Sequence, residues 1–156
     1  MLAYTFVVGD LSPKKRAEAR TTNGLCERLI EGTIRTPMSG EQALPRGKVL
    51  AVCTSERKGI RKRDVGEAEL RPDWGIVGDA HAADWHRQVS LLAWESIEKR
   101  RALGLNVNTG SFAENITTEG INLVDLPIGT RRRLGETLVE VTQIGKECHS
   151  RCAIYA

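Results

Sequence analysis

The residues best suited to chemistry lie near the C-terminal end, in the run Cys148-His149-Ser150-Arg151-Cys152. Two thiols stand four positions apart, and the cations Lys146 and Arg151 are their neighbours in sequence. Nearby positive charge lowers the pKa of a cysteine and stabilises the thiolate, which is the reactive form. Residues 137–142 alternate apolar and polar side chains and predict a strand. The thiols are therefore expected in a loop that follows a strand, where functional groups are often displayed.

A second motif is Gly75-Ile76-Val77-Gly78-Asp79-Ala80-His81. Its glycines permit a tight turn or a close approach of the backbone to a ligand. Asp79 and His81 are two positions apart, so in an extended segment they would lie on the same side. This favours a pocket wall that offers a carboxylate and an imidazole, with His86 at the same mouth. The alternative is a glycine-rich turn in which Asp79 caps the backbone.

A third motif runs from Gly110 to Gly120 and contains Ser111, Glu114 and Asn115. It predicts a short strand followed by a turn at Glu119-Gly120. One interpretation is ordinary hairpin chemistry. The other is a second pocket wall, in which Asn115 or Ser111 forms a hydrogen bond with a polar ligand.

Length and composition indicate one ordinary globular domain, since 156 residues suffice for a hydrophobic core. The net charge is +3, and the basic residues come in short runs at 14–16, 61–63, 99–101 and 131–133. These runs indicate solvated faces or an anionic ligand, which would be a phosphate-bearing cofactor or nucleic acid. Aromatic residues are only 4%, which disfavours nucleic acid because stacking platforms are scarce.

The four cysteines are Cys26, Cys53, Cys148 and Cys152, and they do not suggest a disulfide framework in a chain without an export signal. Cys53 follows an apolar run and is expected to be buried in the core, as is Cys26 on a helical pattern. No apolar run approaches the length that spans a bilayer. The protein is therefore predicted to be cytoplasmic and without membrane association.

From residue 47 onward the pattern is mostly β, with short segments separated by Gly, Pro and Asn turns. The expected strands are Lys48 to Thr54, Glu67 to Leu70, Val89 to Leu92, Ala113 to Thr117, Thr130 to Leu134 and Thr137 to Thr142. An amphipathic helix is expected from Trp94 to Leu103, with Ile97 and Leu103 facing inward. Before residue 47 we expect one apolar strand, a helix that begins at Ser12-Pro13, and a second short helix over residues 25–30.

Six segments, each occurring once along the chain, together resemble the motifs of a known family. They are Gly47-Lys48-Val49-Leu50-Ala51-Val52, Gly75-Ile76-Val77-Gly78-Asp79-Ala80-His81, Arg87-Gln88-Val89-Ser90-Leu91-Leu92, Phe112-Ala113-Glu114-Asn115-Ile116-Thr117, Leu126-Pro127-Ile128-Gly129-Thr130, and Glu140-Val141-Thr142-Gln143-Ile144-Gly145-Lys146-Glu147-Cys148. Together they resemble the MOSC domain, the C-terminal module of molybdenum-cofactor sulfurases, in its short stand-alone bacterial form. The resemblance covers residues 47–155.

The resemblance implies a mostly β, barrel-like fold with a few short helices and a site built around one cysteine. That cysteine falls on Cys148, which would carry sulfur as a persulfide or ligate the molybdenum of the pterin cofactor. Cys152 would be a second or resolving thiol. Asp79, His81 and Asn115 would contribute to cofactor binding. The implied partners are the molybdenum cofactor and its biosynthetic or acceptor proteins.

The resemblance also divides the chain. Residues 47–156 would form the MOSC-like domain, and residues 1–46 would be an N-terminal extension of uncertain nature. The stop at Ala156 predicts that the last strand of the barrel is missing.

Two other functions are consistent with the same residues. Cys148 and Cys152 could form a zinc site with one or two of His149, His81 and His86, since zinc accepts tetrahedral nitrogen and sulfur ligands. The chain could instead be a non-enzymatic binding module. Whether it is an enzyme, by sulfur transfer or a cofactor-dependent reaction, the sequence leaves open.

Overall fold

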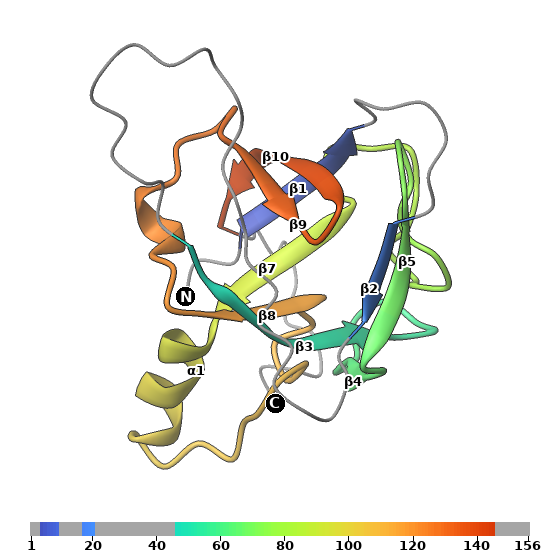
Figure 1. Cartoon of the computed structure of the whole chain (residues 1–156). Helices are drawn as coiled ribbons and strands as arrows, with labels where there is room; N and C mark the ends of the chain where they lie inside the picture. Colours follow the sequence, from blue (N-terminus) through green and yellow to red (C-terminus); the bar gives the residue numbers. More distant parts are fainter. Residues whose placement is uncertain (1–3, 10–16, 21–45, 146–156) are drawn as a thin grey trace, which may run out of the picture.

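A computed structural model describes residues 4–9, 17–20 and 46–145 of the chain (Figure 1). These residues form ten strands, one α-helix and one 3-10 helix. In chain order they are β1 (Tyr4–Gly9), β2 (Ala17–Arg20), β3 (Lys48–Thr54), β4 (Arg63–Asp64), β5 (Glu67–Arg71), β6 (Gly75–Ile76), β7 (Val89–Ala93), α1 (Trp94–Arg101), β8 (Ile116–Glu119), the 3-10 helix (Leu123–Asp125), β9 (Arg131–Leu134) and β10 (Thr137–Ile144).

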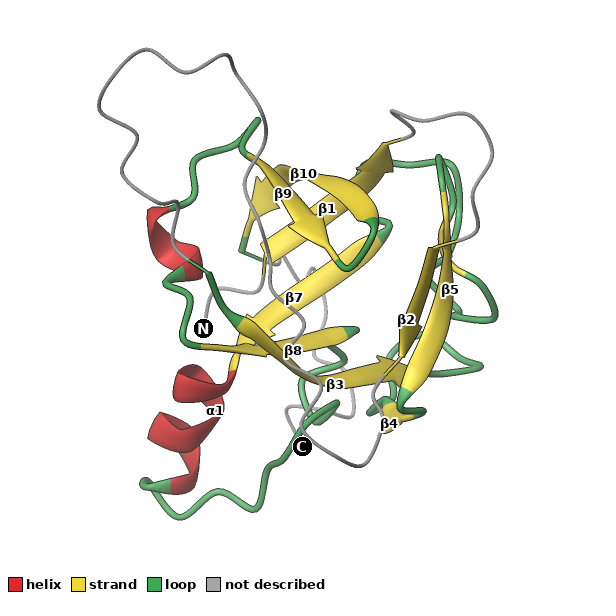
Figure 2. Cartoon of the chain, in the orientation of Figure 1, coloured by secondary structure: helices red, strands yellow, loops and turns green. Residues whose placement is uncertain are grey.

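The strands form two sheets. The larger has the order β4-β3-β8-β7-β1-β10-β9, and the smaller has the order β2-β5-β6. β7 and β8 are parallel, and the other pairs are antiparallel. Figure 2 shows β2 and β5 side by side, apart from β9 and β10. The mostly β expectation is confirmed, whereas the barrel-like closure is not, because no closed barrel forms among the described residues.

Alternating burial explains the clearest strands. In β10 the side chains of Thr137, Val139 and Val141 are buried, and the residues between them are half-buried. This two-residue period places one face of the strand on the core. The core cluster joins both sheets and comprises Val52, Leu70, Ile76, Val89, Leu91, Ile116, Ile121, Leu123, Leu126, Leu134, Val139 and Val141.

Five of the six strands expected after residue 47 are confirmed to within two residues at each end, and the sixth is wrong at its start. The predicted strand Ala113 to Thr117 begins only at Ile116. Ala113 has φ 58°, a left-handed conformation that a strand does not allow. The preceding residues are instead drawn into a loop by the side chain of Glu114, described below.

The expected helix is confirmed over Trp94–Arg101 and is wrong at its C-terminal end. Ile97 is fully buried as predicted, but the Leu103 side chain is 72% exposed. The backbone N–H groups of Leu103 and Gly104 donate to carbonyl oxygens three residues earlier, which turns the chain away after the helix. Among the described residues no helix is both long and apolar enough to cross a bilayer.

The described part of the first 46 residues contributes two strands. β1 lies between β7 and β10 in the large sheet, and β2 pairs with β5. The predicted helix start at Ser12-Pro13 lies outside the described residues. Residues 17–20 form a strand, although Ala and Glu favour helices, because they pair with β5. The second predicted helix, with Cys26, lies outside the described residues. The domain boundary at residue 46 stays a prediction.

Candidate functional site

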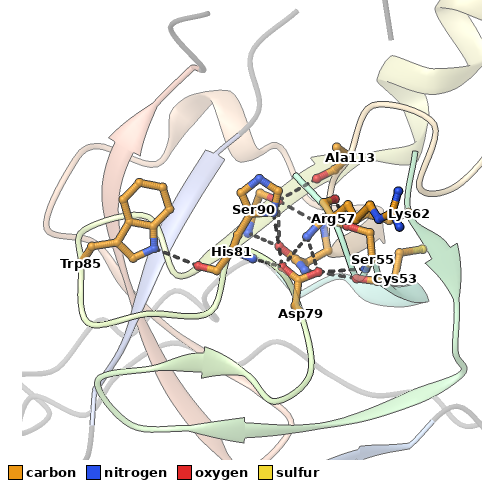
Figure 3. Close-up of polar contacts among 10 residues, drawn as sticks. Cys53, Ser55, Arg57, Lys62, Asp79, His81, Trp85, Ser90 and Ala113 are labelled. Carbon is orange, nitrogen blue, oxygen red and sulfur yellow. Dashed lines mark hydrogen bonds and ion pairs between the residues drawn. The ribbon is translucent and has the colours of Figure 1, made fainter. Parts of the chain in front are cut away.

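Three loops converge beside the end of β3. They are residues 55–62 after β3, residues 77–88 after β6 and residues 108–115 before β8. Backbone hydrogen bonds join them. The N–H of Ala80 donates to the carbonyl of Ser55 at 2.8 Å, and the N–H of Lys62 donates to the carbonyl of Gly110, also at 2.8 Å. The loops therefore form one connected unit (Figure 3).

Asp79 is the anchor of this unit. Its side chain and that of Lys62 are both 0% exposed, and the Lys62 Nζ lies 2.6 Å from each carboxylate oxygen. The backbone N–H groups of Ser55 and His81 each donate to the carboxylate at 3.0 Å. Asp79 thus joins the loop after β3 to the loop after β6.

The charge of Asp79 is stabilised in spite of its burial. Burial by itself raises the pKa of the carboxyl group, but the contacts with His81 and the ammonium of Lys62 outweigh it and hold the pKa of Asp79 well below its usual range. At neutral pH the Asp79 side chain is therefore an anion, and it is paired with the buried ammonium of Lys62. Its role in this geometry is to position the loops.

His81 lies beside Asp79, as the sequence predicts. Its Nδ1 is 3.5 Å from Asp79 Oδ1, too long for a strong hydrogen bond, and this buried nitrogen has no hydrogen-bond partner among the described residues. The His81 carbonyl oxygen accepts a hydrogen bond of 2.9 Å from the Trp85 indole N–H. The contacts of Asp79 match the interpretation in which it caps a turn, because its carboxylate accepts backbone N–H groups. The role of Asp79 and His81 as a pocket wall stays a prediction.

Asn115 lies beside β3, immediately before β8. Its Oδ1 accepts from the backbone N–H of Ser90 at 3.2 Å and from the Ser90 hydroxyl at 3.0 Å, and its Nδ2 donates to the Cys53 carbonyl at 3.1 Å. Asn115 therefore ties β8 to β7 and β3. These contacts are internal, and its predicted contact with a cofactor remains a prediction. Ser111 is also buried, and its hydroxyl accepts from the Asn108 N–H at 2.9 Å.

The loop before β8 is shaped by Glu114, which the sequence analysis did not assign to the positioning of the site. The buried carboxylate accepts from the N–H groups of Gly110 at 2.6 Å and Phe112 at 3.0 Å, and from the Thr117 hydroxyl at 3.1 Å. Burial raises the pKa of Glu114. Gly110 has φ +75°, and a Cβ there would lie 2.2 Å from the Lys62 carbonyl oxygen, so only glycine fits this contact.

Of the four cysteines, only Cys53 lies in the described residues. It is buried and free, as predicted. Burial, together with the nearby negative charges of Glu114 and Asp64, raises the pKa of its thiol to about 12. Cys53 is therefore chemically inert at neutral pH.

The predicted thiols Cys148 and Cys152, with His149, lie outside the described residues. The chain leading to them is tied to the candidate site, because the Thr142 hydroxyl donates to the His86 carbonyl at 2.5 Å. Six peptide units separate Thr142 from Cys148, which limits their Cα separation to about 20 Å. No three His, Cys, Asp or Glu side chains within the described ranges gather to hold a metal ion, and the zinc hypothesis depends on the two thiols.

An aromatic and basic cluster borders the loop after β6. The Lys58 Nζ lies 5.4 Å from the centre of the Trp85 ring, and the Arg87 Cζ lies 5.1 Å from it. The His86 ring packs edge-on against the same indole with 5.7 Å between ring centres. Sequence reasoning placed His86 at a pocket mouth but missed Lys58, Trp85 and Arg87.

Lys62 was also missed, because it lies within a basic run that suggested a solvated face. The structure buries Lys62 between the exposed Arg61 and Arg63, which is the alternation of an extended segment with one face on the protein interior. The sequence gives no sign of it, because all three residues are basic. The partner of Lys62, Asp79, is 17 positions away, and nothing in the sequence pairs them.

Comparison with known protein families identifies the family to which residues 78–156 are similar. The family model described as the MOSC domain matches residues 78–156, which is 79 of the 156 residues. The match begins at the Gly78-Asp79 turn and includes Asn115, Cys148 and Cys152. Comparisons with curated proteins and with solved structures found no match. On the match over half of its length, this chain belongs to the MOSC domain family.

Proposed function

We propose that this chain binds the molybdenum cofactor, or carries sulfur as a persulfide, with the thiolate of Cys148 as the reacting group. The MOSC domain is associated with molybdenum-cofactor binding and sulfurase-type function. The observation that carries the proposal is the family match itself, which begins at the turn anchored by Asp79 and extends over Cys148.

The residues present fit the cofactor. A soft metal centre favours sulfur ligands, and Cys148 would supply one. The buried Nδ1 of His81 has no hydrogen-bond partner among the described residues, so the imidazole retains an unused polar atom next to the anchored turn. The cations around Trp85 suit the phosphate of the cofactor. When bound, the cofactor supplies a metal centre that takes a thiolate ligand.

The division of roles follows from the contacts. Cys148 would hold the metal, and His81 would face the bound group. Asp79 and Asn115 would act by positioning, because their polar atoms already hold the loops together. This refines the expectation that Asp79 and Asn115 contact the cofactor themselves.

In the sulfur-carrying form, the Cys148 thiolate attacks the outer sulfur of a persulfide on a donor protein. A new S–S bond forms on Cys148 while the S–S bond of the donor breaks, and the donor leaves as a thiolate. The exchange is balanced without an external oxidant. Cys152, as the second thiol, would attack the inner sulfur of the Cys148 persulfide. The Cys148–Cys152 disulfide then forms as the S–S bond of the persulfide breaks, and the outer sulfur leaves as hydrosulfide.

Native mass spectrometry of the full chain tests the proposal, using protein purified without oxygen from cells that make the cofactor. We expect a bound pterin, or a gain of about 32 Da on Cys148 from one added sulfur. Cys148→Ser should abolish both signals, and Cys26→Ser, at a position with no assigned role, should leave them unchanged. Cofactor and sulfur signals that persist in Cys148→Ser would contradict the proposal.

The same preparation separates the two alternatives. Stoichiometric zinc that is lost in both Cys148→Ser and Cys152→Ser would favour a zinc site. A Cys148 thiol that reacts at the rate of an ordinary cysteine, with neither pterin nor sulfur bound, would favour a non-enzymatic binding module.

A further inference from the structure

β9 is an edge strand, and one side of its backbone is open. Among the described strands it is the last of the large sheet and pairs with β10 alone (Figure 1). Leu134 and Thr137 close the hairpin of these strands around a two-residue turn, so their backbone groups bond to each other. Bonding alternates along an antiparallel pair, so Arg132 also faces β10. The backbone N–H and carbonyl groups of Arg131 and Arg133 therefore point to the open side.

The opposite edge of the large sheet is less suited to accept another strand. It is formed by β4, which has only two residues. One of them is Asp64, whose carboxylate already accepts a hydrogen bond of 2.9 Å from the Gly66 N–H. Very short edge strands discourage pairing with another chain. Of the two edges of this sheet, the four-residue strand β9 is therefore the one that offers a template.

Arg132 lies at this open edge with an unused donor. Its Nε is buried and has no hydrogen-bond partner among the described residues. Its Nη1 makes a long contact of 3.3 Å with the carbonyl oxygen of Arg131, which is one of the groups on the open side. The same side chain lines a pocket whose other walls are apolar and include Leu123, Leu126 and Leu134. Burial lowers the pKa of the Arg132 guanidinium, because its charge is partly removed from water.

The neighbouring arginines differ in whether the protein neutralises them. Arg131 is paired within the hairpin, since its Nε lies 2.7 Å from Glu140. Arg133 is exposed, and none of the ion pairs within residues 46–145 involves Arg132 or Arg133. Successive side chains of a strand point to opposite faces of the sheet. β9 therefore presents one positive charge without a carboxylate on each of its faces.

This charge pattern selects the kind of strand that the edge accepts. Pairing of β9 with β9 of a second copy would bring arginines together, and like charges on paired strands are destabilising. A strand that carries carboxylates would instead supply the anions that Arg132 and Arg133 lack. Charge complementarity thus favours an acidic partner over self-association.

We propose that the open edge of β9 binds an extended, acidic segment of a partner protein as an added strand. The backbone groups of Arg131 and Arg133 would form the new hydrogen bonds. Two consecutive carboxylates of the segment would point to opposite faces, so that one reaches Arg132 and the other reaches Arg133. The carboxylate at Arg132 would give its buried Nε an acceptor. The surface does not depend on the proposed function, because none of the residues assigned to that function lies on β9.

The probe is the peptide acetyl-Thr-Val-Glu-Glu-Val-Thr-amide, titrated into the full chain at constant ionic strength and followed by the NMR signals of the backbone amides. Its valines place an apolar side chain on both faces, so either register suits the apolar pocket. Strand addition should slow amide hydrogen exchange at Arg131 and Arg133. Exchange at Arg132 and Leu134 should stay unchanged, because their N–H groups already face β10.

Variants of the chain test the charges. Arg132→Gln should weaken binding of the peptide about tenfold, the loss of a charge-assisted hydrogen bond at a partly buried group. Arg133→Gln should weaken it about fivefold, because that pair would be more exposed. Arg101→Gln is the matched control. It removes an exposed arginine from α1 and should leave the affinity unchanged.

Two altered peptides separate strand addition from simple attraction between charges. Glutamine in place of both glutamates should weaken binding at least tenfold. N-methyl groups on both glutamates keep the charges and remove one N–H from each edge of the peptide. This change should weaken binding about fivefold, the loss of one backbone hydrogen bond.

Three results would overturn the proposal. They are equal affinity for the N-methylated peptide, exchange that slows equally at all four residues of β9, and unchanged affinity in both glutamine variants of the chain. Arg133 is exposed, so its replacement leaves the fold intact and keeps the test decisive if Arg132→Gln unfolds. A dimer of the free chain in which the amides of Arg131 and Arg133 are already protected would assign the edge to a second copy and would also overturn the proposal.

Discussion

Replacement of Lys62 by methionine should destabilise the protein far more than removal of a typical charged residue. The substitution keeps most of the side-chain volume and removes the ammonium 2.6 Å from both oxygens of Asp79. Both side chains are fully buried, so water cannot replace the lost partner. Leaving one half of a buried pair costs about 3–5 kcal/mol. Because two backbone N–H groups still donate to the carboxylate, we expect about 3 kcal/mol.

The cost should depend on pH, with a sign fixed by the direction of the pKa shift. In the folded protein the pKa of Asp79 lies below its usual value, so its contribution is present above about pH 3.9 and is lost as the pH falls further. Without Lys62, burial dominates and the folded pKa rises. Protonation then relieves the unpaired charge in the variant. The difference in stability between the two proteins should therefore shrink as the pH is lowered from 7 towards 4.

Urea unfolding followed by circular dichroism measures both effects, in a double-mutant cycle with Asp79→Asn. The two substitutions combined should cost at least about 2 kcal/mol less than the sum of the single costs. Arg131→Ala is the matched control. Its Nε lies 2.7 Å from Glu140, but that pair is 51% and 39% exposed, and its removal should cost about 1 kcal/mol or less. Single costs for Lys62 and Asp79 that add to within about 0.5 kcal/mol would refute the reasoning.

Three further predictions follow from the packing. In urea unfolding, Gly110→Ala should destabilise the protein by at least about 3 kcal/mol more than Gly120→Ala. Both glycines have positive φ, but only a Cβ at position 110 meets backbone atoms. Equal costs would contradict the contact with Lys62. Ile97→Ala should cost about 2–5 kcal/mol and Leu103→Ala within about 0.5 kcal/mol, which checks by thermal unfolding where the helix ends. At pH 8, iodoacetamide should leave Cys53 unlabelled in the native protein and should modify it in urea. Mass spectrometry of peptides measures the labelling. Rapid labelling of the native protein would disprove the burial of Cys53.

The family and the strand pattern could be predicted from the sequence because both depend on local order. β3 and β7 are recognisable by short apolar runs, and β5 and β10 by side chains that alternate at a two-residue period. The Gly78-Asp79 turn and Cys148 both lie within the segment that the family model matches. Features of this kind depend only on residues that are close together in the sequence.

The elements that failed depend on distant partners. Residues 17–20 have good helix formers and yet form β2, because β5 offers an antiparallel partner 50 positions away. The strand predicted from Ala113 begins three residues late, since the Glu114 carboxylate gathers N–H groups into a loop. The pattern of apolar residues along the sequence reports neither effect.

The sequence by itself determined which residue types are available to the site: a carboxylate and an imidazole in one turn, an amide in a later segment, and thiols near the end. Only the tertiary structure decided which of the charged groups outside the C-terminal segment lie together. Lys62 looked like a solvated cation and is the buried partner of Asp79, and Lys58 and Arg87 each lie near the ring of Trp85. The physical reason is that charge pairing and burial act through space, between loops that are far apart along the chain.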